Sequence, residues 1–400
     1  MSKWEMVKLS EIFTLQMGKT PSRDNQEYWN GEHKWVSIAD LGKANKYIDD
    51  TKECITNLAI SETGIKSTPK NTVVMSFKLS IGKTAITIDN IYTNEAIMSF
   101  IDKRIYKIDI DYIYYLFSGK DWSEGSNKAV MGITLNKATL SNVSIPLPPL
   151  ETQHKIAANL DKVTHIIDLC NAILEKLDLL VKSRFIELFG DPVINPHHWE
   201  KVPLGKLAEI KIGPFGTLLH KEDYIQNAHA LVNPSHIVDG KIAVDMKLTV
   251  SDDKYNELSA YHLSIDDVVM GRRGEMGRCA VVSENGFLCG TGSMIIRSNG
   301  RLKADYIQKI ISFPSFKTTI EDMAVGQTMP NLNVPIVSKF MIICPPIEVQ
   351  EQYYSFVEHT DKSKFYTGKI RKIIRSVKNN EQLCVFTDKT CLSAFCTGDC

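Results

Sequence analysis

The sequence lacks the segments that place a protein in or across a membrane. No uninterrupted apolar run approaches 18 residues, and the opening "MSKWEMVKLS" has no apolar core of the kind that a signal peptide needs. The 47 basic and 47 acidic residues cancel, so the whole chain offers no cationic surface for coating a polyanion, although a local basic face stays open. The length of 400 residues predicts two or three domains, and 43% hydrophobic residues are enough for a substantial core in each half. Since membrane and signal segments are missing, we expect a soluble cytoplasmic protein.

Catalytic signatures are also missing. "GKT" occurs at 18–20 and at 82–84, but a phosphate-binding loop needs a glycine five residues before the glycine of its Gly-Lys pair, and Phe13 and Phe77 stand there. The patterns HExxH and GxSxG, and the Asn-Pro-Pro-aromatic segment of adenine methyltransferases, are absent. We therefore predict no catalytic residues. An enzyme with an unrecognised site remains the alternative, which methyl transfer or cleavage by the purified chain would support.

The nine cysteines form no disulfide or metal pattern. Five stand singly among apolar neighbours and are expected to be reduced, buried thiols: Cys54, Cys170, Cys279, Cys289 and Cys344. The other four crowd the last 17 residues: Cys384, Cys391, Cys396 and Cys400. They include no CxxC pair and have no histidine nearby, so we expect a disordered tail over 381–400 and no metal ligands.

A unit of about 195 residues occurs twice. "WEMVKLSEIFTLQMG" (4–18) returns as "WEKVPLGKLAEIKIG" (199–213), and "PPLETQ" (148–153) returns as "PPIEVQ" (345–350). Between them, "VVMS" and "GKTAI" of the first half match "VVMG" and "GRCAV" of the second at the same offset. This repeat is far too long for a solenoid and has the size of a domain.

The two halves, 1–148 and 195–345, are expected to be mixed α+β globules. Short apolar runs such as "NTVVMSF" and "CAVVSE" are separated by Gly, Asn and Asp. Between the repeated flanks, 24–72 has little in common with 219–267 in residues or loop spacing. The halves therefore share a frame and differ in their inserts.

An apolar heptad follows the first Pro-Pro pair and predicts a long helix over 149–190. Glycine and proline in "FGDP" would end it. Spacings of 3 and 4 are typical of a coiled coil, which needs a partner helix; a helix lying on its own domain is the alternative and usually has a broader apolar stripe. The predicted seam comprises Ile156, Leu160, Val163, Ile167, Cys170, Leu174, Leu177 and Val181.

The second Pro-Pro pair should begin the partner helix, over 346–380. Continuing the heptad onto it gives mostly polar seam positions: Val357, Thr360, Lys364, Thr367, Arg371 and Ile374. A shifted apolar seam predicts a register change near Gly368. Its positions are Tyr366, Ile370, Ile373 and Val377.

Short basic loops carry the candidate binding residues. "GKTPSR" (18–23) gathers hydroxyl and cationic donors around a Gly and a Pro, and "FKLSIGK" (77–83) has the counterpart "GRRGEMGR" (271–278). Arginine forks bind guanine bidentately, and lysine binds phosphate as a point charge. Solvated hairpin tips remain the alternative, but recurrence in both halves favours nucleic-acid contacts. The candidate DNA-binding residues are Lys19, Thr20, Ser22, Arg23, Lys78, Lys83, Thr217, Arg272, Arg273 and Arg278.

With these residues in view, the chain resembles the specificity (S) subunits of type I restriction-modification enzymes, as far as about residue 378. "GKTPSRDNQEYWNGEHKWVSIADL" (18–41) is similar to the family's opening motif, and "IPLPPLETQHKIAANLD" (145–161) to the start of its central helix. "FIELFGDP" (185–192) is similar to its link into the second half. The resemblance implies an α+β fold of two similar mixed α/β target-recognition domains, joined by two long helices that form an antiparallel coiled coil.

The resemblance also implies a DNA-specificity subunit without activity of its own. Each half would recognise one part of a bipartite target in double-stranded DNA, which is expected to be asymmetric because the inserts differ. Two methyltransferase subunits would dock and bring S-adenosylmethionine, and restriction subunits would bring ATP and Mg²⁺. The complete enzyme would be a site-specific adenine DNA methyltransferase and ATP-dependent endonuclease. The alternative is a non-catalytic two-domain scaffold that binds proteins and reads no DNA sequence.

Overall fold

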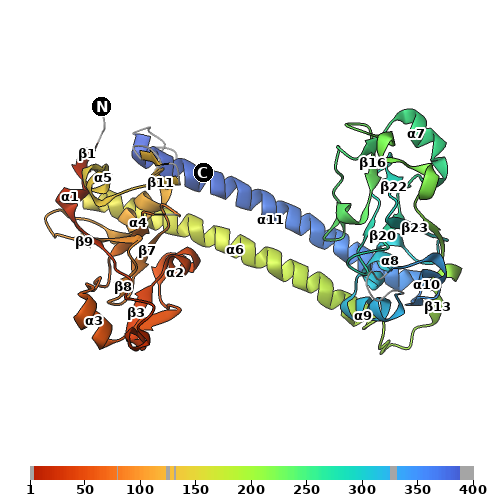
Figure 1. The fold of residues 1–400 in the computed structure, drawn as a ribbon, viewed down its shortest axis with the longest axis horizontal. Helices are drawn as coiled ribbons and strands as arrows, with labels where there is room; N and C mark the ends of the chain where they lie inside the picture. The colour runs from red at the N-terminus through yellow and green to blue at the C-terminus, as the bar shows by residue number, and fades with distance from the viewer. Residues whose placement is uncertain (1–3, 79, 123–126, 130–131, 325–330, 388–400) are drawn as a thin grey trace, which may run out of the picture. The chain divides into compact units, whose positions relative to one another are not determined.

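The chain forms two compact units in the computed structural model (Figure 1). Unit 1 comprises residues 1–174 and 366–400, and unit 2 comprises residues 175–365. Two long helices, α6 (Leu150–Phe189) and α11 (Ile347–Thr387), contribute to both units. The residues that the structure describes are 4–78, 80–122, 127–129, 132–324 and 331–387.

The core of unit 1 is a five-stranded sheet in the order β2-β9-β6-β7-β4. The first three pairings are antiparallel and the last is parallel. Helix α4 packs on this sheet, with the rings of Phe117 and Phe100 4.7 Å apart in a T-shaped contact. The elements of unit 1 before α6 are β1 Glu5–Lys8, α1 Leu9–Ile12, β2 Phe13–Met17, η1 Gln26–Tyr28, β3 Trp29–Val36, α2 Ile38–Lys43, β4 Tyr47–Ile48, β5 Glu53–Ile55, α3 Asn57–Thr63, β6 Val73–Ser76, β7 Thr84–Thr87, β8 Tyr92–Thr93, β9 Ile97–Asp102, α4 Ile110–Gly119, β10 Asn127–Ala129, β11 Gly132–Thr134, α5 Lys137–Asn142 and β12 Ser144–Leu147.

Unit 2 contains a four-stranded antiparallel sheet in the order β14-β23-β20-β21. Helix α8 packs on it through Tyr306, Ile307 and Ile310, which share a buried cluster with Met270 and Ile296. The elements between α6 and α11 are β13 Lys201–Pro203, η2 Leu204–Lys206, β14 Ala208–Ile212, η3 Gly216–Leu218, η4 Lys221–Asp223, β15 Tyr224–Ile225, β16 His229–Val232, η5 Pro234–His236, β17 Ile237–Val238, β18 Lys241–Ile242, β19 Thr249–Val250, α7 Asp252–Glu257, η6 Ser259–Tyr261, β20 Asp267–Gly271, β21 Cys279–Val281, β22 Leu288–Cys289, β23 Ser293–Ser298, α8 Ala304–Ile311, α9 Pro314–Met323, α10 Val334–Ser338 and β24 Met341–Ile343.

The two units repeat one topology, as the sequence duplication predicts. The order β2-β9-β6-β7 corresponds to β14-β23-β20-β21, and the terminal pair β1-β12 corresponds to β13-β24. Leu-Asn occurs at 135–136 and again at 332–333, and its asparagine has the same structural role twice. Asn136 caps α5 by accepting from the Thr139 N–H (2.8 Å), and Asn333 caps α10 by accepting from the Ile336 N–H (3.0 Å). The predicted fold of two similar mixed α/β domains joined by two long helices is confirmed.

Helix α6 has the predicted seam. All eight seam residues are buried or half-buried, whereas the neighbouring Ile166, Leu169 and Leu179 are exposed. Gly190 ends the helix in the left-handed conformation that favours glycine, with φ +72°, and its N–H donates to the Ile186 carbonyl at 2.8 Å. The ends of α6 belong to the two cores: Ile156 and Leu160 are buried in unit 1, and Phe185 and Phe189 in unit 2.

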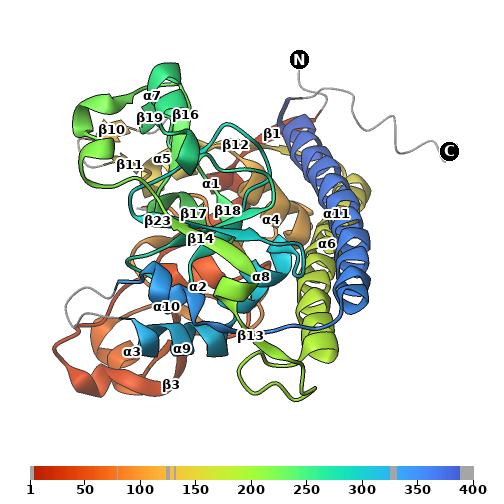
Figure 2. The same ribbon diagram turned by 90° about the vertical axis from the view of Figure 1, so that its right-hand side faces the viewer.

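Helices α6 and α11 lie side by side and antiparallel (Figures 1 and 2). Within unit 2, Asp178 on α6 pairs with Lys364 on α11 at 2.7 Å. Within unit 1, the Asn171 side-chain oxygen accepts from Arg371 Nη1 at 3.0 Å. Residue numbers therefore rise along α6 as they fall along α11.

The predicted register change on α11 is wrong. The unshifted heptad positions, from Val357 to Ile374, are all buried or half-buried. On the shifted seam, Tyr366, Ile370 and Ile373 are 63%, 49% and 64% exposed. Polar side chains occupy the seam because they find partners there: Lys364 pairs with Asp178, and Arg371 with Asn171.

Two further expectations need correction. Residues 381–387, predicted to belong to a disordered tail, continue α11 to Thr387, because no Gly or Pro stands between Gly368 and Thr387. The remaining tail, with Cys391, Cys396 and Cys400, lies outside the described residues. Of the five cysteines expected to be buried, Cys54 is only half-buried, while the other four are buried free thiols. None of the helices that the structure describes is long and apolar enough to span a membrane.

Candidate functional site

The loop that begins at Gly18 is held against the segment before β9. Gly18 N–H donates to the Ile97 carbonyl (3.2 Å) and Lys19 N–H to the Thr93 carbonyl (2.8 Å). A Cβ at Gly18 would lie 2.2 Å from the Thr93 carbonyl oxygen, so only glycine permits this approach. The loop that follows is therefore placed at one edge of the sheet.

The first predicted basic hairpin meets the same segment. Residues 77–83 connect the antiparallel strands β6 and β7, and Phe77 N–H donates to the Ala96 carbonyl at 3.0 Å. On its other side, the Phe77 carbonyl accepts from the Leu135 N–H at 3.2 Å. The structure thus brings the two candidate loops of the first half together, although they are about 60 residues apart in sequence.

Unit 2 repeats this arrangement. Gly213 N–H donates to the Ser293 carbonyl (3.0 Å), and Arg272 N–H donates to the Gly292 carbonyl (2.9 Å). The Arg272 carbonyl in turn accepts from the Leu332 N–H at 3.0 Å, as Phe77 does from Leu135. Thr217 lies in η3 of the loop after Gly213.

The side chains of the first loop bind other parts of unit 1. Lys19 Nζ donates to the Thr63 carbonyl, and Thr20 Oγ1 donates to the Glu95 carboxylate. The Arg23 guanidinium lies 3.9 Å from the Trp29 ring and is paired bidentately with Glu53, whose hydrogen bonds raise the pKa of Arg23. The Ser22 carbonyl accepts from the Trp29 indole N–H at 3.1 Å. These contacts fix the shape of the loop and engage donors that the sequence predicts to face DNA.

The hairpin of unit 1 presents lysines. Lys83 is exposed, and its ammonium lies close to Gly42 of α2, where a Cβ would be 2.6 Å from Nζ. Lys78 is half-buried, with its ammonium 5.3 Å from the centre of the Phe77 ring. Both are positioned as point charges near the edge formed by the two loops.

The hairpin of unit 2, residues 272–278 between β20 and β21, places its three arginines differently. Arg272 is half-buried and its Nε donates to the Leu332 carbonyl at 3.0 Å; burial, and then the neighbouring Arg273 charge, lower its pKa. Arg278 donates to the Pro234 carbonyl (3.2 Å) and to Glu275 (2.7 Å). Arg273 is exposed, and its guanidinium has no hydrogen-bond or ion-pair partner among the residues that the structure describes.

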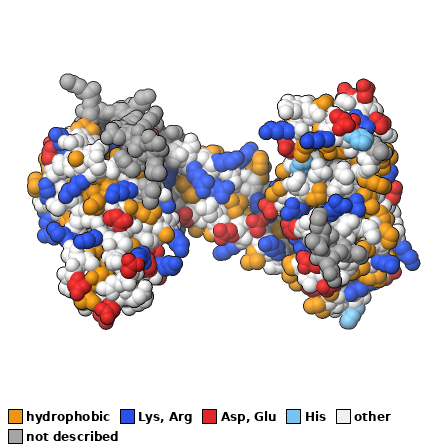
Figure 3. Space-filling model, in the orientation of Figure 1, with side chains coloured by type: hydrophobic (Ala, Val, Ile, Leu, Met, Phe, Trp, Pro, Cys, Tyr) orange, Lys and Arg blue, Asp and Glu red, His pale blue; other side chains and the backbone are white. Residues whose placement is uncertain are grey.

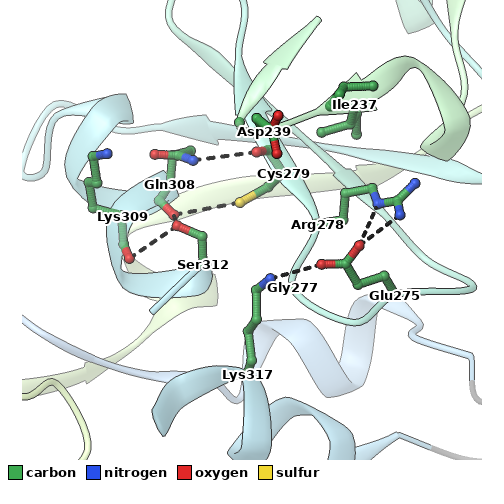
Figure 4. Close-up of a pocket in the computed structure, with 12 residues that line it drawn as sticks. Ile237, Asp239, Glu275, Gly277, Arg278, Cys279, Gln308, Lys309, Ser312 and Lys317 are labelled. Atoms are coloured by element: carbon green, nitrogen blue, oxygen red, sulfur yellow. Dashed lines mark hydrogen bonds and ion pairs between the residues drawn. The ribbon is translucent and has the colours of Figure 1, made fainter. Parts of the chain in front are cut away.

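A cavity of about 390 Å³ lies beside this hairpin (Figure 4). Glu275, which accepts from Lys317 of α9 at 3.0 Å as well as from Arg278, stands at its rim. Lys309 of α8 and Ser312, the residue that follows this helix, line it from the other side. Glu275 is part of the quoted "GRRGEMGR" but carried no role in the sequence prediction, and nothing in the sequence connects it with Lys317.

A second charged cluster that the sequence did not indicate ties the unit 1 domain to α6. Lys46 Nζ lies 2.6 Å from Asp161 of α6 and 2.8 Å from Asp111 of α4. Burial alone lowers the pKa of Lys46, but the hydrogen bonds to Asp111 and Asp161 outweigh it and raise that pKa. Tyr115 O–H also donates to Asp161 at 2.6 Å, so the domain is held on its helix by a network.

The surface carries both signs of charge. Figure 3 shows Lys and Arg side chains interspersed with Asp and Glu on the visible face of each unit. Within the described part of the chain, no three His, Cys, Asp or Glu side chains gather as metal ligands. What the described residues offer in each unit is a glycine-anchored loop beside a basic hairpin, whose cations are suited to phosphate oxygens and base edges.

Comparison with known proteins shows a family match over both halves of the chain. The model of the type I restriction modification DNA specificity domain matches residues 1–179 and again residues 196–375. The MjaIX type I restriction enzyme specificity subunit of Methanocaldococcus jannaschii is 28% identical over 383 residues, covering 89% of this chain and 86% of that subunit.

Two solved structures share the fold. One comes from work on the complex assembly and conformational transition of the type I R-M system. Its TM-score is 0.66 and its sequence identity 14%, over 96% of this chain and 97% of that one. The other is the S subunit of a type I restriction-modification system from M. genitalium, with a TM-score of 0.53 and 15% identity over 97% of both chains. At these identities the likeness concerns the fold alone.

Proposed function

The chain belongs to the type I restriction modification DNA specificity family, and we propose that it is the subunit that selects the DNA sequence for such an enzyme. Each globular domain recognises one part of an asymmetric bipartite target in double-stranded DNA. The protein itself is non-catalytic and acts in the cytoplasm, where the DNA is.

One observation supports this proposal above the others. Both units bring a glycine-anchored loop and a basic hairpin together at the same edge of the same sheet. The frames are equivalent, but the side chains on them differ: lysines at positions 78 and 83 stand where unit 2 has Arg273 and Arg278. Equivalent frames with different donors are what two readers of different half-sites require.

The two long helices supply the spacing between the readers. Helices α6 and α11 pair antiparallel with a polar contact in each unit. In this proposal the helix pair sets the spacing of the two half-sites on DNA. Half-site spacing is set in the same way in dimeric repressors, where the protein's own geometry determines the separation.

The helices also offer a docking surface for two methyltransferase subunits. Ile166, Leu169 and Ile173 of α6 and Ile370 and Ile373 of α11 are each more than 40% exposed. Large aliphatic side chains repeated along helices and left in water favour association with another apolar helix face. Restriction subunits would join this complex through the methyltransferases.

The chemistry belongs to those partners. S-adenosylmethionine would be held by the methyltransferase subunits, and ATP and Mg²⁺ by the restriction subunits. The assembled enzyme is then a site-specific adenine DNA methyltransferase and an ATP-dependent endonuclease. This chain contributes recognition and spacing.

The test is to produce the chain with its methyltransferase subunits in a host without other adenine methylation, and to map methylated adenines at base resolution. We expect one bipartite motif with two different half-sites. Lys78→Ala should then relax only one half-site, and Arg273→Ala only the other, since losing a base contact costs about 1–3 kcal/mol at its own position. Methylation or footprinting without sequence preference would support the scaffold alternative and contradict the proposal.

A further inference from the structure

The tip of the unit 2 hairpin presents a donor and an acceptor side by side. Arg273, Gly274 and Glu275 are three successive exposed residues. Gly274 has φ +82°, and a Cβ added there would meet nothing within 4 Å, so the tip projects into open space. The charged residues Arg273 and Glu275 flank this glycine.

Arg273 and Glu275 carry opposite charges but do not pair with each other. The Glu275 carboxylate accepts from Arg278 (2.7 Å) on one side and from Lys317 of α9 (3.0 Å) on the other (Figure 4). Hydrogen bonds from Arg278, and then from Lys317, lower the pKa of Glu275, so the carboxylate is ionised at neutral pH. Arg273 is left without a partner among the described residues, with its donors available.

Building on the proposed function, we propose that Arg273 and Glu275 together recognise a single G·C base pair in the major groove. Guanine presents two acceptors there, N7 and O6, which match the guanidinium fork. The paired cytosine presents the N4 amino group, a donor that matches a carboxylate. A donor-donor-acceptor set on one loop tip is complementary to that base pair and to no other in the same orientation.

The positions of Arg278 and Lys317 explain how a carboxylate can approach DNA at all. A lone glutamate would be repelled by the phosphates, but two cations within 3.0 Å offset its charge. They also hold its oxygens in place from two different elements, the hairpin itself and α9, which preorganises the acceptor. Arg278 and Lys317 are therefore positioning residues, and Arg273 and Glu275 are the contacts.

Unit 1 does not repeat this pair. The positions that correspond to Arg273 and Glu275 are Lys78 and Ser80, which form no fork and no carboxylate. Ser80 also uses its carbonyl to accept from the Ser76 hydroxyl within the hairpin. The G·C specificity should accordingly belong to one half-site only.

The experiment uses the full chain with its methyltransferase subunits and maps methylated adenines in cells. Arg273→Ala and Glu275→Ala should each make one base pair degenerate, and it should be the same base pair in both variants. Discrimination against the wrong base there should fall about tenfold or more. Lys317→Met keeps the carboxylate but removes one of its supports, so it should produce a smaller loss at that same position.

Glu284→Ala is the matched control, because it removes an exposed carboxylate of unit 2 outside the hairpin and should leave the motif unchanged. If Glu275 only braced the hairpin, Glu275→Ala and Lys317→Met would lower methylation at all target sites alike. That uniform loss would overturn the inference, as would degeneracy at two different base pairs or a changed position that is not G·C in the wild-type motif. Absence of any bipartite motif in the wild type would refute the proposed function itself.

Discussion

The side-chain amides of Gln153 and Gln350 make the same three hydrogen bonds in the two units. Gln153 accepts from Asp109 N–H (2.8 Å) and donates to the carbonyls of Lys107 (3.1 Å) and Pro148 (2.8 Å). Gln350 accepts from Lys303 N–H (3.1 Å) and donates to the carbonyls of Arg301 (3.4 Å) and Pro345 (3.0 Å). Each fully buried amide ties the first turn of a long helix to the loop before α4 or α8. This shared set of hydrogen bonds explains why the glutamine that ends "PPLETQ" recurs at the end of "PPIEVQ".

Removing either amide should destabilise its unit. In Gln153→Leu or Gln350→Leu, one part-buried backbone donor and two acceptors lose their partners. The carbonyl of Pro148 or Pro345 stays buried without its partner, which costs about 1–3 kcal/mol. We expect a clear fall in the urea concentration at the unfolding midpoint of both variants. Gln352→Leu, at an exposed position of α11, is the control and should change little. Equal urea midpoints in all three variants would show that the hydrogen bonds of Gln153 and Gln350 do not contribute to stability.

The two arginine–carboxylate pairs of unit 2 should differ in their contribution to stability. Arg297 donates twice to Asp267 at 2.7 Å, and that carboxylate is buried although the Arg297 side chain is 46% exposed. Arg297→Met would leave the carboxylate with the Ser264 N–H and should cost about 1–3 kcal/mol. Arg301 pairs with Glu200 in water, so Arg301→Met should change the stability little. Thermal unfolding of both variants measures the difference. Equal losses would mean that burial does not decide the strength of these pairs.

Breaking helix α6 should abolish assembly with the methyltransferase subunits without unfolding the two globular domains. Leu174 lies half-buried on the seam of α6, and Leu174→Pro removes a helical N–H and costs about 3 kcal/mol. We expect loss of the complex with methyltransferase subunits on size exclusion while both globular domains stay folded. Leu174→Met keeps an apolar helix-forming residue and should assemble normally. Intact assembly of the proline variant would contradict the spacing role of the helices.

Deleting residues 381–400 should leave the DNA motif unchanged. The contacts that hold α11 in unit 1, Arg371 with Asn171 and Lys378 over the Tyr115 ring at 5.7 Å, precede the deletion. Adenine methylation mapping compares the truncated and full chains, and metal analysis of the full chain measures zinc. Stoichiometric zinc together with loss of folding on deletion would refute the expectation that the tail is dispensable and binds no metal.

The sequence alone determined the features that depend on local pattern. The duplication could be predicted from the repeated residues. The seam of α6 could be predicted from its heptad, since a row of apolar side chains on a helix is buried against whichever element packs on it. The ends of that helix could also be predicted, because proline and Gly190 act within one or two turns. The basic hairpins were found in the same way, from glycines and cations close together in the chain.

The tertiary structure alone decided which side chains have partners. Lys364 and Arg371 look unsuited to a seam until Asp178 and Asn171, almost 200 residues earlier, are placed opposite them. Arg23 is held in place by Glu53, and the Glu275 carboxylate is oriented by Lys317 of α9. Neither pair could be predicted from the sequence. Ion pairs and hydrogen bonds form only between groups a few ångströms apart in space. The separation of two residues along the chain does not show whether the fold brings them that close.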